Sequence, residues 1–415
     1  MKPLIPSPRA GAFGALAQTI LPGSNPIALP FLQQRASHAP PAKPRAAARE
    51  AGWHDDFYRR IVSGADPSKA ERTFPVPYVT TRSPSSLVKV VCPTCKQSLV
   101  PDGEDWKCPS CARPFTHNQG ILSFLTPEER FNEGAYEADQ IAAWTASARL
   151  RDKIRSSKLL TFLNRLRIKF SLSGRRDRVF LNEMQRGAGR QRLILDLGCG
   201  GGRHYFRYYG KVIGIDPVLP LLQMAGKIYD EVYQTSGFKL PFADESFDYV
   251  VSSDVLGHIG TENKDLLFSE IRRVLKKGGR TVHCSEADAD NIWFRFAHRY
   301  PELYEIFFVN KPGHISLEKP TQIRARFLKH GFREIAFGRL SSTLQTPGTH
   351  VAMFDNEYRR KSKWISACVA IDKVLNANFA IREALNFLLE PLARLEDWLT
   401  PEDSTSGALV VYEKA

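Results

Sequence analysis

The sequence predicts an α/β protein whose main domain contains a mostly parallel sheet with helices on both faces, joined to a small metal-binding module. From residue 191 onward, short apolar runs of strand length alternate with helical patterns, which is typical of a parallel sheet. Upstream, two pairs of cysteines recur at the spacing of a metal-binding ribbon. The predicted divisions are a leader and connector at 1–84, a ribbon at 85–126, a basic helical segment at 127–190 and the α/β domain at 191–415.

The strands and helices of the α/β domain follow from its apolar patterns. Strands are expected at 193–197, 211–215, 247–252, 279–284, 333–339 and 408–412, and helices at 263–276 and 320–330. The last two strands are separated by residues 341–405, which a minimal sheet does not need. Helical patterns near 359–375 and 380–398 predict that this stretch is a helical insert before the last strand.

The first 49 residues contain no acidic side chain, six basic ones and many prolines. Prolines at this density oppose a stable helix, so a disordered leader is expected, with an organellar transit peptide as the alternative. A short helix is expected near Phe57–Ile61. No run approaches the ~18–20 apolar residues of a membrane span, and the seven cysteines suit a reducing compartment with a metal site, so a cytoplasmic location is expected.

A glycine-rich turn follows the strand 193–197. That strand carries Asp196, and glycines then stand at 198, 200, 201 and 202. The next strand, 211–215, is followed directly by a second acid, Asp216. A strand, a glycine turn, a helix, a strand and an acid make up the first unit of a Rossmann-like domain, which predicts a nucleoside site.

The residues around the turn discriminate between nucleosides. A dinucleotide fingerprint requires a third glycine where this chain has Arg203. The carboxylate of Asp196 would repel a pyrophosphate, but it suits a ligand with a cationic amino group. Asp216 stands where a carboxylate can accept hydrogen bonds from both ribose hydroxyls. A nucleoside with a free ribose and an amino-acid tail is S-adenosylmethionine, the cofactor that we expect here.

Two motifs resemble those of the class I S-adenosylmethionine-dependent methyltransferases, in particular the type 11 group. The glycine turn resembles their motif I, and Leu240–Ile259 resembles their LPF-x-x-x-S-FD-x-V-x-S-x-x-x-x-H stretch. The resemblance implies a Rossmann-like sheet of seven strands. Their adenine-binding acid is matched here by Ser236, so backbone and apolar contacts near Gly237 are expected instead. The implied cofactor-binding residues are Asp196, Gly198, Cys199, Gly200, Gly201, Gly202, Asp216, Gly237, Phe238 and Ser253.

Methyl transfer is an in-line displacement on a sulfonium carbon, so the enzyme mainly positions its two reactants. A base is needed only if the acceptor must lose a proton. Side chains near the predicted strand ends are the candidates, with a structural or surface role as the alternative for each histidine. They are Asp254, His258, Glu286 and His314, with His204 as a further candidate.

The cysteines Cys92, Cys95, Cys108 and Cys111 form two C-x₂-C pairs separated by twelve residues. Each pair can present two thiolates to one tetrahedral ion, and four thiolates leave no open position, so a structural Zn²⁺ is expected. Glycine often follows the second cysteine of such a turn, whereas Lys96 and Ala112 follow here and make each turn less comfortable. The segment Gly120–Leu125 resembles the tail of ribbons that precede bacterial methyltransferases, including rRNA guanine methyltransferases.

Most of the net charge of +14 is concentrated in one segment. Residues 149–192 contain fourteen basic and three acidic side chains, a net charge of +11. This segment could contact a polyanion such as RNA, anionic lipid headgroups or a phosphorylated substrate, and a solvated helical face is the alternative.

These features predict a methyltransferase with an unassigned acceptor. A small molecule, saccharide or lipid is slightly favoured, because the insert 341–405 and the segment Pro312–Ile315 could cover the site. An rRNA or tRNA base is the first alternative, since the ribbon and the basic segment suit RNA. An inactive scaffold or binding protein with the same fold is the second alternative.

Overall fold

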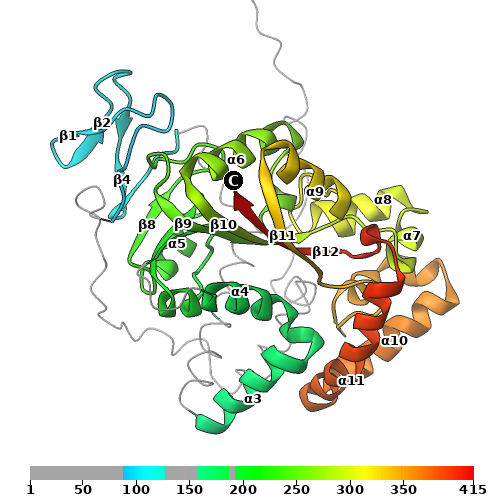
Figure 1. The fold of residues 1–415 in the computed structure, drawn as a ribbon. Coiled ribbons are helices and arrows are strands. Elements are labelled where there is room, and N and C mark those ends of the chain that lie inside the picture. The colour runs from blue at the N-terminus through cyan, green and yellow to red at the C-terminus, as the bar shows by residue number, and fades with distance from the viewer. Residues whose placement is uncertain (1–86, 127–144, 146–156, 187–191, 347) are drawn as a thin grey trace, which may run out of the picture. The chain divides into compact units, whose positions relative to one another are not determined.

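The computed structural model describes residues 87–126, 145, 157–186, 192–346 and 348–415, all within the compact unit Ala51–Ala415. The predicted leader and connector at 1–84, the short helix near Phe57–Ile61 and most of 127–156 lie outside the described residues. The largest element is a seven-stranded sheet with the order β11-β12-β10-β9-β6-β7-β8 (Figure 1).

Five neighbouring strands of this sheet run parallel. The last strand along the chain, β12, lies between β11 and β10 and is antiparallel to both. The strands are β6 (Leu193–Leu197), β7 (Lys211–Asp216), β8 (Glu231–Gln234), β9 (Phe247–Ser253), β10 (Leu275–Glu286), β11 (Phe332–Arg339) and β12 (Gly407–Lys414). The predicted fold class, an α/β protein with a mostly parallel seven-stranded sheet, is confirmed.

Helices pack on both faces of the sheet, with a separate apolar core on each face. Side chains of α6 (Thr261–Val274) and α9 (Pro320–Lys329) belong to one core. The other core includes α4 (Arg175–Gln185) and α5 (Leu219–Ala225), and Phe206 of the short helix η5 (His204–Tyr208). This arrangement leaves the carboxyl ends of the parallel strands along one edge, where open α/β sheets bind ligands.

The ribbon forms two small sheets and packs against the large one. Its strands are β1 (Val100–Asp102), β2 (Asp105–Lys107), β3 (Pro114–Phe115), β4 (His117–Asn118) and β5 (Ile121–Leu122). The Phe124 N–H donates to the Gln234 carbonyl at 2.8 Å, and Ser123 bridges the same residue in parallel. Ribbon side chains, Cys92 and Cys108 among them, share one core with β6, β7 and β9. The ribbon therefore pairs with the outer strand β8 and belongs to the sheet's core.

The predicted insert contains α10 (Lys363–Ala377) and α11 (Phe379–Leu399), together with η8 (His350–Phe354), η9 (Glu357–Arg360) and η10 (Glu402–Ser404). An aromatic core joins it to α7 (Ile292–Ala297), α8 (Pro301–Tyr304) and the π-helical turn η7 (Glu305–Asn310), which follow β10. None of the described helices alone is long and apolar enough to cross a membrane. Together α10 and α11 meet that length and composition, as a pair bent by 112°.

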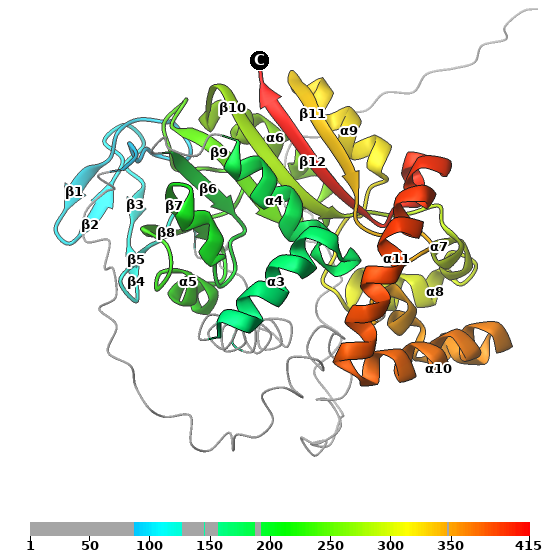
Figure 2. The ribbon, with the colours of Figure 1, turned by 60° about the horizontal axis from the view of Figure 1, so that its bottom comes forward.

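The described part of the basic segment consists of α3 (Lys158–Phe170), η4 (Leu172–Gly174) and α4, shown in Figure 2. Several of its arginines bind acids of other elements. Arg175 contacts Glu390 at 2.8 Å and Asp397 at 2.7 Å, and Arg178 contacts Glu390 at 3.1 Å. Two of the arginines of α4 thus form ion pairs that hold α11 against the α/β domain. The exposed basic side chains lie mainly on α3, at Lys158, Arg165 and Lys169.

Candidate active site

The candidate site lies at the carboxyl ends of β6, β7, β9 and β10. Asp196 is the second-last residue of β6, Asp216 ends β7, Asp254 follows β9 and Glu286 ends β10. Because these four strands are parallel neighbours, their ends meet at one edge of the sheet. Asp196 and Glu286, which are almost a hundred positions apart in the sequence, therefore lie at a common edge of the sheet.

The glycine turn after β6 depends on the absence of side chains. Gly198 has a φ of +64°, and a Cβ there would lie 2.5 Å from Cγ2 of Val255. Gly202 has a φ of +81°, and its Cβ would lie 3.2 Å from Cα of Ala225 in α5. A larger residue at either position would combine backbone strain with a steric clash. The turn therefore packs against the loop that follows β9 on one side and against α5 on the other.

Asp216 holds this turn in place. Its two carboxylate oxygens accept hydrogen bonds from the N–H groups of Gly200 and Val218, each at 2.9 Å. Burial raises the pKa of Asp216 to about 6, although both N–H donors oppose the shift. Each oxygen has a second lone pair, so the carboxylate keeps the capacity to accept from ribose hydroxyls.

Asp196 is buried and has a partner that the sequence did not indicate. The Tyr229 hydroxyl donates to Asp196 at 2.5 Å and accepts from the N–H of Arg203 at 2.6 Å. Burial raises the pKa of Asp196 to about 7, and the bond from Tyr229 opposes that shift. A cationic ammonium group beside Asp196 would favour its carboxylate form.

The other predicted cofactor residues lie around this edge. The N–H of Cys199 donates to Ile215 at 2.9 Å and its thiol is buried, which ties the turn to β7. The Ser253 hydroxyl donates to Asp254 at 3.1 Å. A Cβ on Gly237 would lie 3.0 Å from Leu267, and Phe238 packs partly buried against the core shared with Leu197. Gly201 is buried within the turn itself.

Four predicted catalytic side chains gather beyond the glycine turn. Asp254 has a φ of +61° and forms an ion pair with Arg176 of α4. Burial alone would raise the pKa of Asp254, but the guanidinium groups of Arg176 and Arg203 outweigh it and lower that pKa. Burial and the charge of Asp254 raise the pKa of the neighbouring Glu286.

The two histidines complete this group. The rings of His258 and His314 lie 5.0 Å apart between centroids, and Nε2 of His314 lies 3.9 Å from Oε1 of Glu286. Burial would lower the pKa of His314, but the neighbouring carboxylate of Glu286 outweighs it and raises that pKa. His204, the further candidate, begins η5 and is not part of this group.

Comparison with known families matches the segment that carries the glycine turn and the carboxylates Asp196 and Asp216. Residues 195–283 match a family model described as a methyltransferase domain. The chain contains a methyltransferase domain. The match includes Asp196, the glycine turn, Asp216 and the β9 loop, so the class I methyltransferase resemblance of these motifs is confirmed.

Curated relatives match a limited part of the chain. Probable tRNA methyltransferase 9B of Bos taurus is 35% identical over 110 residues, which cover 26% of this chain and 23% of the relative. The tRNA (carboxymethyluridine(34)-5-O)-methyltransferase of Arabidopsis thaliana is 31% identical over 135 residues, which cover 30% of this chain and 31% of the relative. The chain thus spans less than a third of the length of either relative.

Solved structures also resemble part of the chain, at low sequence identity. Phosphoethanolamine N-methyltransferase 2 of Haemonchus contortus, in complex with S-adenosyl-L-methionine, has a TM-score of 0.35 and 20% identity, and covers 57% of this chain and 52% of its own.

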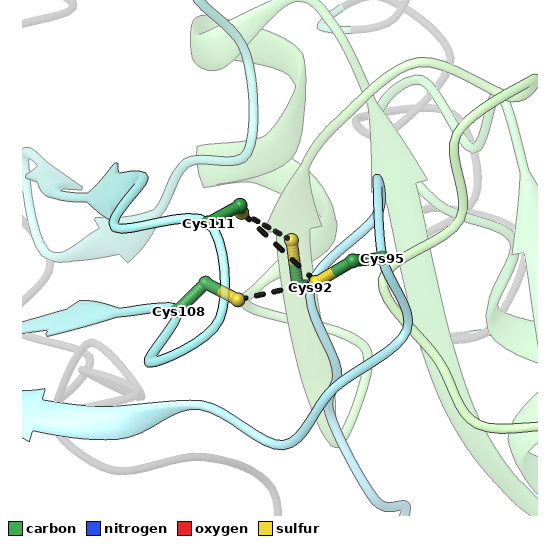
Figure 3. A group of neighbouring side chains, drawn as sticks. All are labelled: Cys92, Cys95, Cys108 and Cys111. Carbon is green, nitrogen blue, oxygen red and sulfur yellow. Dashed lines mark hydrogen bonds between the residues drawn. The ribbon is translucent and has the colours of Figure 1, made fainter.

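The four cysteines ahead of the methyltransferase domain point toward one another from two turns (Figure 3). Their sulfur atoms are 3.6 Å apart for Cys92 and Cys111, 3.2 Å for Cys95 and Cys108, and 4.0 Å for Cys95 and Cys111. Thiolates bound to a tetrahedral zinc ion lie about 3.8 Å apart, so the group fits this ion closely. Burial would raise the pKa of Cys108, but N–H groups of Cys111 and Ser110 lower it to about 6.

Both residues that follow the cysteine pairs have the strained backbone that the sequence predicted. Lys96 has a φ of +60° and Ala112 a φ of +56°. The ammonium group of Lys96 contacts Glu270 of α6 at 2.8 Å and the Leu240 carbonyl at 3.3 Å. Lys96 therefore connects the ribbon to the methyltransferase domain.

Three residues of the site were not assigned a role from the sequence: Tyr229, Arg176 and Arg203. Tyr229 follows α5 and belongs to no motif, and Arg176 was counted only as part of the positive charge. Arg203 was noted because it replaces a glycine, which was a usable signal, but its proximity to Asp254 depends on the folded chain.

Proposed function

We propose that this protein is an S-adenosylmethionine-dependent methyltransferase whose acceptor is an RNA nucleotide. The observation that carries the first part is the pair of buried carboxylates, Asp196 and Asp216, around a glycine turn inside the segment that matches the methyltransferase domain. The cofactor would supply a methyl group on a sulfonium centre. Asp196 would hold its ammonium group, Asp216 its ribose, and the glycine turn would fix the direction of the methyl group.

The names of the curated relatives support an RNA acceptor. Two of the relatives described above are named as tRNA methyltransferases. This favours the RNA alternative over the small molecule that the sequence slightly favoured. Their alignments cover less than a third of this chain, so the support for RNA also depends on surfaces of this chain.

The surface of α3 is suited to single-stranded RNA. Phe162 and Phe170 are about half exposed, and the ammonium group of Lys169 lies 5.1 Å from the Phe170 ring centre. Lys158 and Arg165 are also exposed on this helix. Aromatic rings can stack on bases while the cations bind phosphates, which is the usual combination in single-strand binding.

A lipid or other small apolar acceptor is the second candidate, because α11 exposes an apolar face. Trp398 is 80% exposed, and leucines lie on the same helix at 388, 392, 395 and 399 with at least half of their surface exposed. Such a face could contact an apolar acceptor or its carrier surface.

Cofactor binding is tested by calorimetry with S-adenosylmethionine on the full chain. We expect Asp216→Ala to weaken binding about 10- to 100-fold, since a hydrogen bond to a charged group contributes about 1.5–3 kcal/mol. Glu302→Ala, a change at an exposed position, is the control. No binding by the wild-type protein would support the scaffold alternative.

The acceptor is tested with tritiated methyl groups on a fractionated cell extract. We expect label in the RNA fraction, and reduced label there for Arg165→Glu with unchanged cofactor affinity. Label in the lipid or small-molecule fraction would contradict RNA and support the second candidate.

A further inference from the structure

Three side chains lie close together at the carboxyl edge of the sheet: His258 in the turn after β9, Glu286 at the end of β10 and His314 after η7. One possible ligand atom from each lies within 4.8 Å of the others. In the part of the chain that the structure describes, only this group and the ribbon cysteines bring three such side chains this close. The donors are two imidazoles and one carboxylate, which is the ligand set of many catalytic divalent ions.

Hydrogen bonds fix the orientation of both rings. Nδ1 of His258 donates to the Gly313 carbonyl and Nδ1 of His314 donates to the Phe308 carbonyl, each at 2.8 Å. A carbonyl only accepts, so Nδ1 of each ring carries a proton, and in the neutral form of the ring the lone pair lies on Nε2. Metal-binding histidines commonly have this arrangement, because the outer hydrogen bond fixes the tautomer and the ring.

The two loops that carry the histidines are fastened together. The N–H groups of Ile315 and Ser316 donate to the Gly257 carbonyl at 2.8 and 3.1 Å. A Cβ on Gly257 would lie 3.1 Å from Cδ2 of His314 and 3.6 Å from Oε2 of Glu286. Glycine at this position therefore provides the space in which His314 and Glu286 approach the turn of His258.

Glu286 supplies a buried acceptor atom that lacks a hydrogen-bond partner. Its Oε2 atom is fully buried and accepts no hydrogen bond from the described residues. Its other oxygen lies 3.9 Å from Nε2 of His314, which is too long for a hydrogen bond but suits two ligands on either side of an ion. A buried carboxylate oxygen needs a hydrogen-bond donor or a cation, and an ion held between this oxygen and the two imidazoles would meet that need.

We propose that His258, Glu286 and His314 bind a divalent transition-metal ion, with Zn²⁺ as the representative. Three protein ligands leave at least one coordination position open, unlike the four thiolates of the ribbon. The turn of His258 begins at Val255, which lies against Gly198 of the cofactor turn. An open position there would face the methyl acceptor, and the ion would hold and polarise an oxygen of that molecule.

The test measures zinc in the purified full-length protein after equilibration with micromolar Zn²⁺ and removal of the free ion. Zn²⁺ is a suitable probe because nitrogen and oxygen sites bind it more tightly than Mn²⁺ or Fe²⁺. We expect two zinc ions per chain in the wild-type protein and one in His314→Ala and Glu286→Gln. His298→Ala, a change at a partly exposed histidine that contacts Asp288, should keep two.

A competition titration with a chelator gives the affinity of the second ion, and His258→Ala should weaken it by at least about 100-fold. One zinc ion per chain in the wild-type protein would overturn the proposal, as would two in His314→Ala. Retention of the ribbon ion and of cofactor binding shows that a variant is folded. The readout requires no methyl acceptor, so it is independent of whether the acceptor is RNA.

Discussion

The ribbon and the carboxyl edge of the sheet both gather ligand side chains, but they do so by opposite means. The four ribbon cysteines lie within residues 92–111, on two turns that each carry a pair. The edge assembles Asp196, Asp216, Glu286 and His314 from the ends of separate strands and loops. Local spacing therefore reveals the ribbon, whereas the composition of the edge depends on the order of the strands.

The two regions also differ in what they leave available. Four thiolates complete a tetrahedral ion, and two of the cysteines are buried in a core that the ribbon shares with the sheet. At the edge, carboxylates and imidazoles keep lone pairs that can bind a ligand. We therefore expect the ribbon to contribute to stability and the carboxyl edge of the sheet to contribute to the chemistry.

The largest expected effect is on the ribbon. We expect Cys108→Ser to lose the ribbon ion and to lower the free energy of unfolding by at least about 3 kcal/mol, because zinc binding in such sites contributes to folding. The shared core means that the edge strand β8 is destabilised as well. Denaturant unfolding with zinc analysis measures both effects.

The control for this prediction is Cys368→Ser, a change at a partly buried cysteine of α10 outside the ribbon. Wild-type stability together with a wild-type zinc content in Cys108→Ser would show that the thiolates are not ligands.

A smaller effect is expected at the edge for Gly257→Ala. The added Cβ would force His314 to move by a few tenths of an ångström. We expect zinc affinity at the second site to fall by about 10-fold, as for changes around metal ligands, with the ribbon ion retained. Gly338→Ala, whose Cβ would meet neighbours only at 3.5 Å or more, is the matched control. Equal loss of both ions would mean that the two sites are not separable.

The sequence was sufficient for the regions where local pattern decides structure. Strands β6, β7 and β9 match their predicted ranges almost residue for residue, because each is an apolar run that ends at a turn. The strand β8 was not predicted, since Glu231-Val232-Tyr233-Gln234 has two polar residues among four and owes its conformation to pairing with β7. Likewise, no pattern links Tyr229 to Asp196, because their contact depends on the packing of α5.

The edge should respond to pH in a range where its buried acids titrate. Burial raises the pKa of Asp196 to about 7 and that of Asp216 to about 6. Folding therefore favours their protonated forms, and that contribution to stability is present below pH ~4 and is lost as the pH rises through 6–7. S-adenosylmethionine carries a cationic group that binds the carboxylate form of Asp196. Its affinity should therefore increase as the pH rises.

We expect the affinity for S-adenosylmethionine to decrease by up to about tenfold per pH unit as the pH falls below 7. Calorimetry between pH 8 and 5.5 measures this dependence, and Asp196→Asn should flatten it. An affinity of the wild-type protein that does not vary over this range would show that Asp196 does not bind the cationic group.

The smallest expected effects distinguish the two turns of the ribbon. Ala112 is exposed with a φ of +56°, so Ala112→Gly relieves a conformation that costs about 1 kcal/mol and loses part of that gain to the more flexible unfolded chain. We expect a stabilisation of about 0.5 kcal/mol. Lys96→Gly relieves the same strain but removes the contact with Glu270, a carboxylate that also accepts from Arg273 and from the N–H of Leu240. This variant should be destabilised, because the lost contact joins the ribbon to α6 and is partly buried. Denaturant unfolding measures the sign of the change in the free energy of unfolding for each variant. Stabilisation of both would mean that Lys96 contributes only backbone strain.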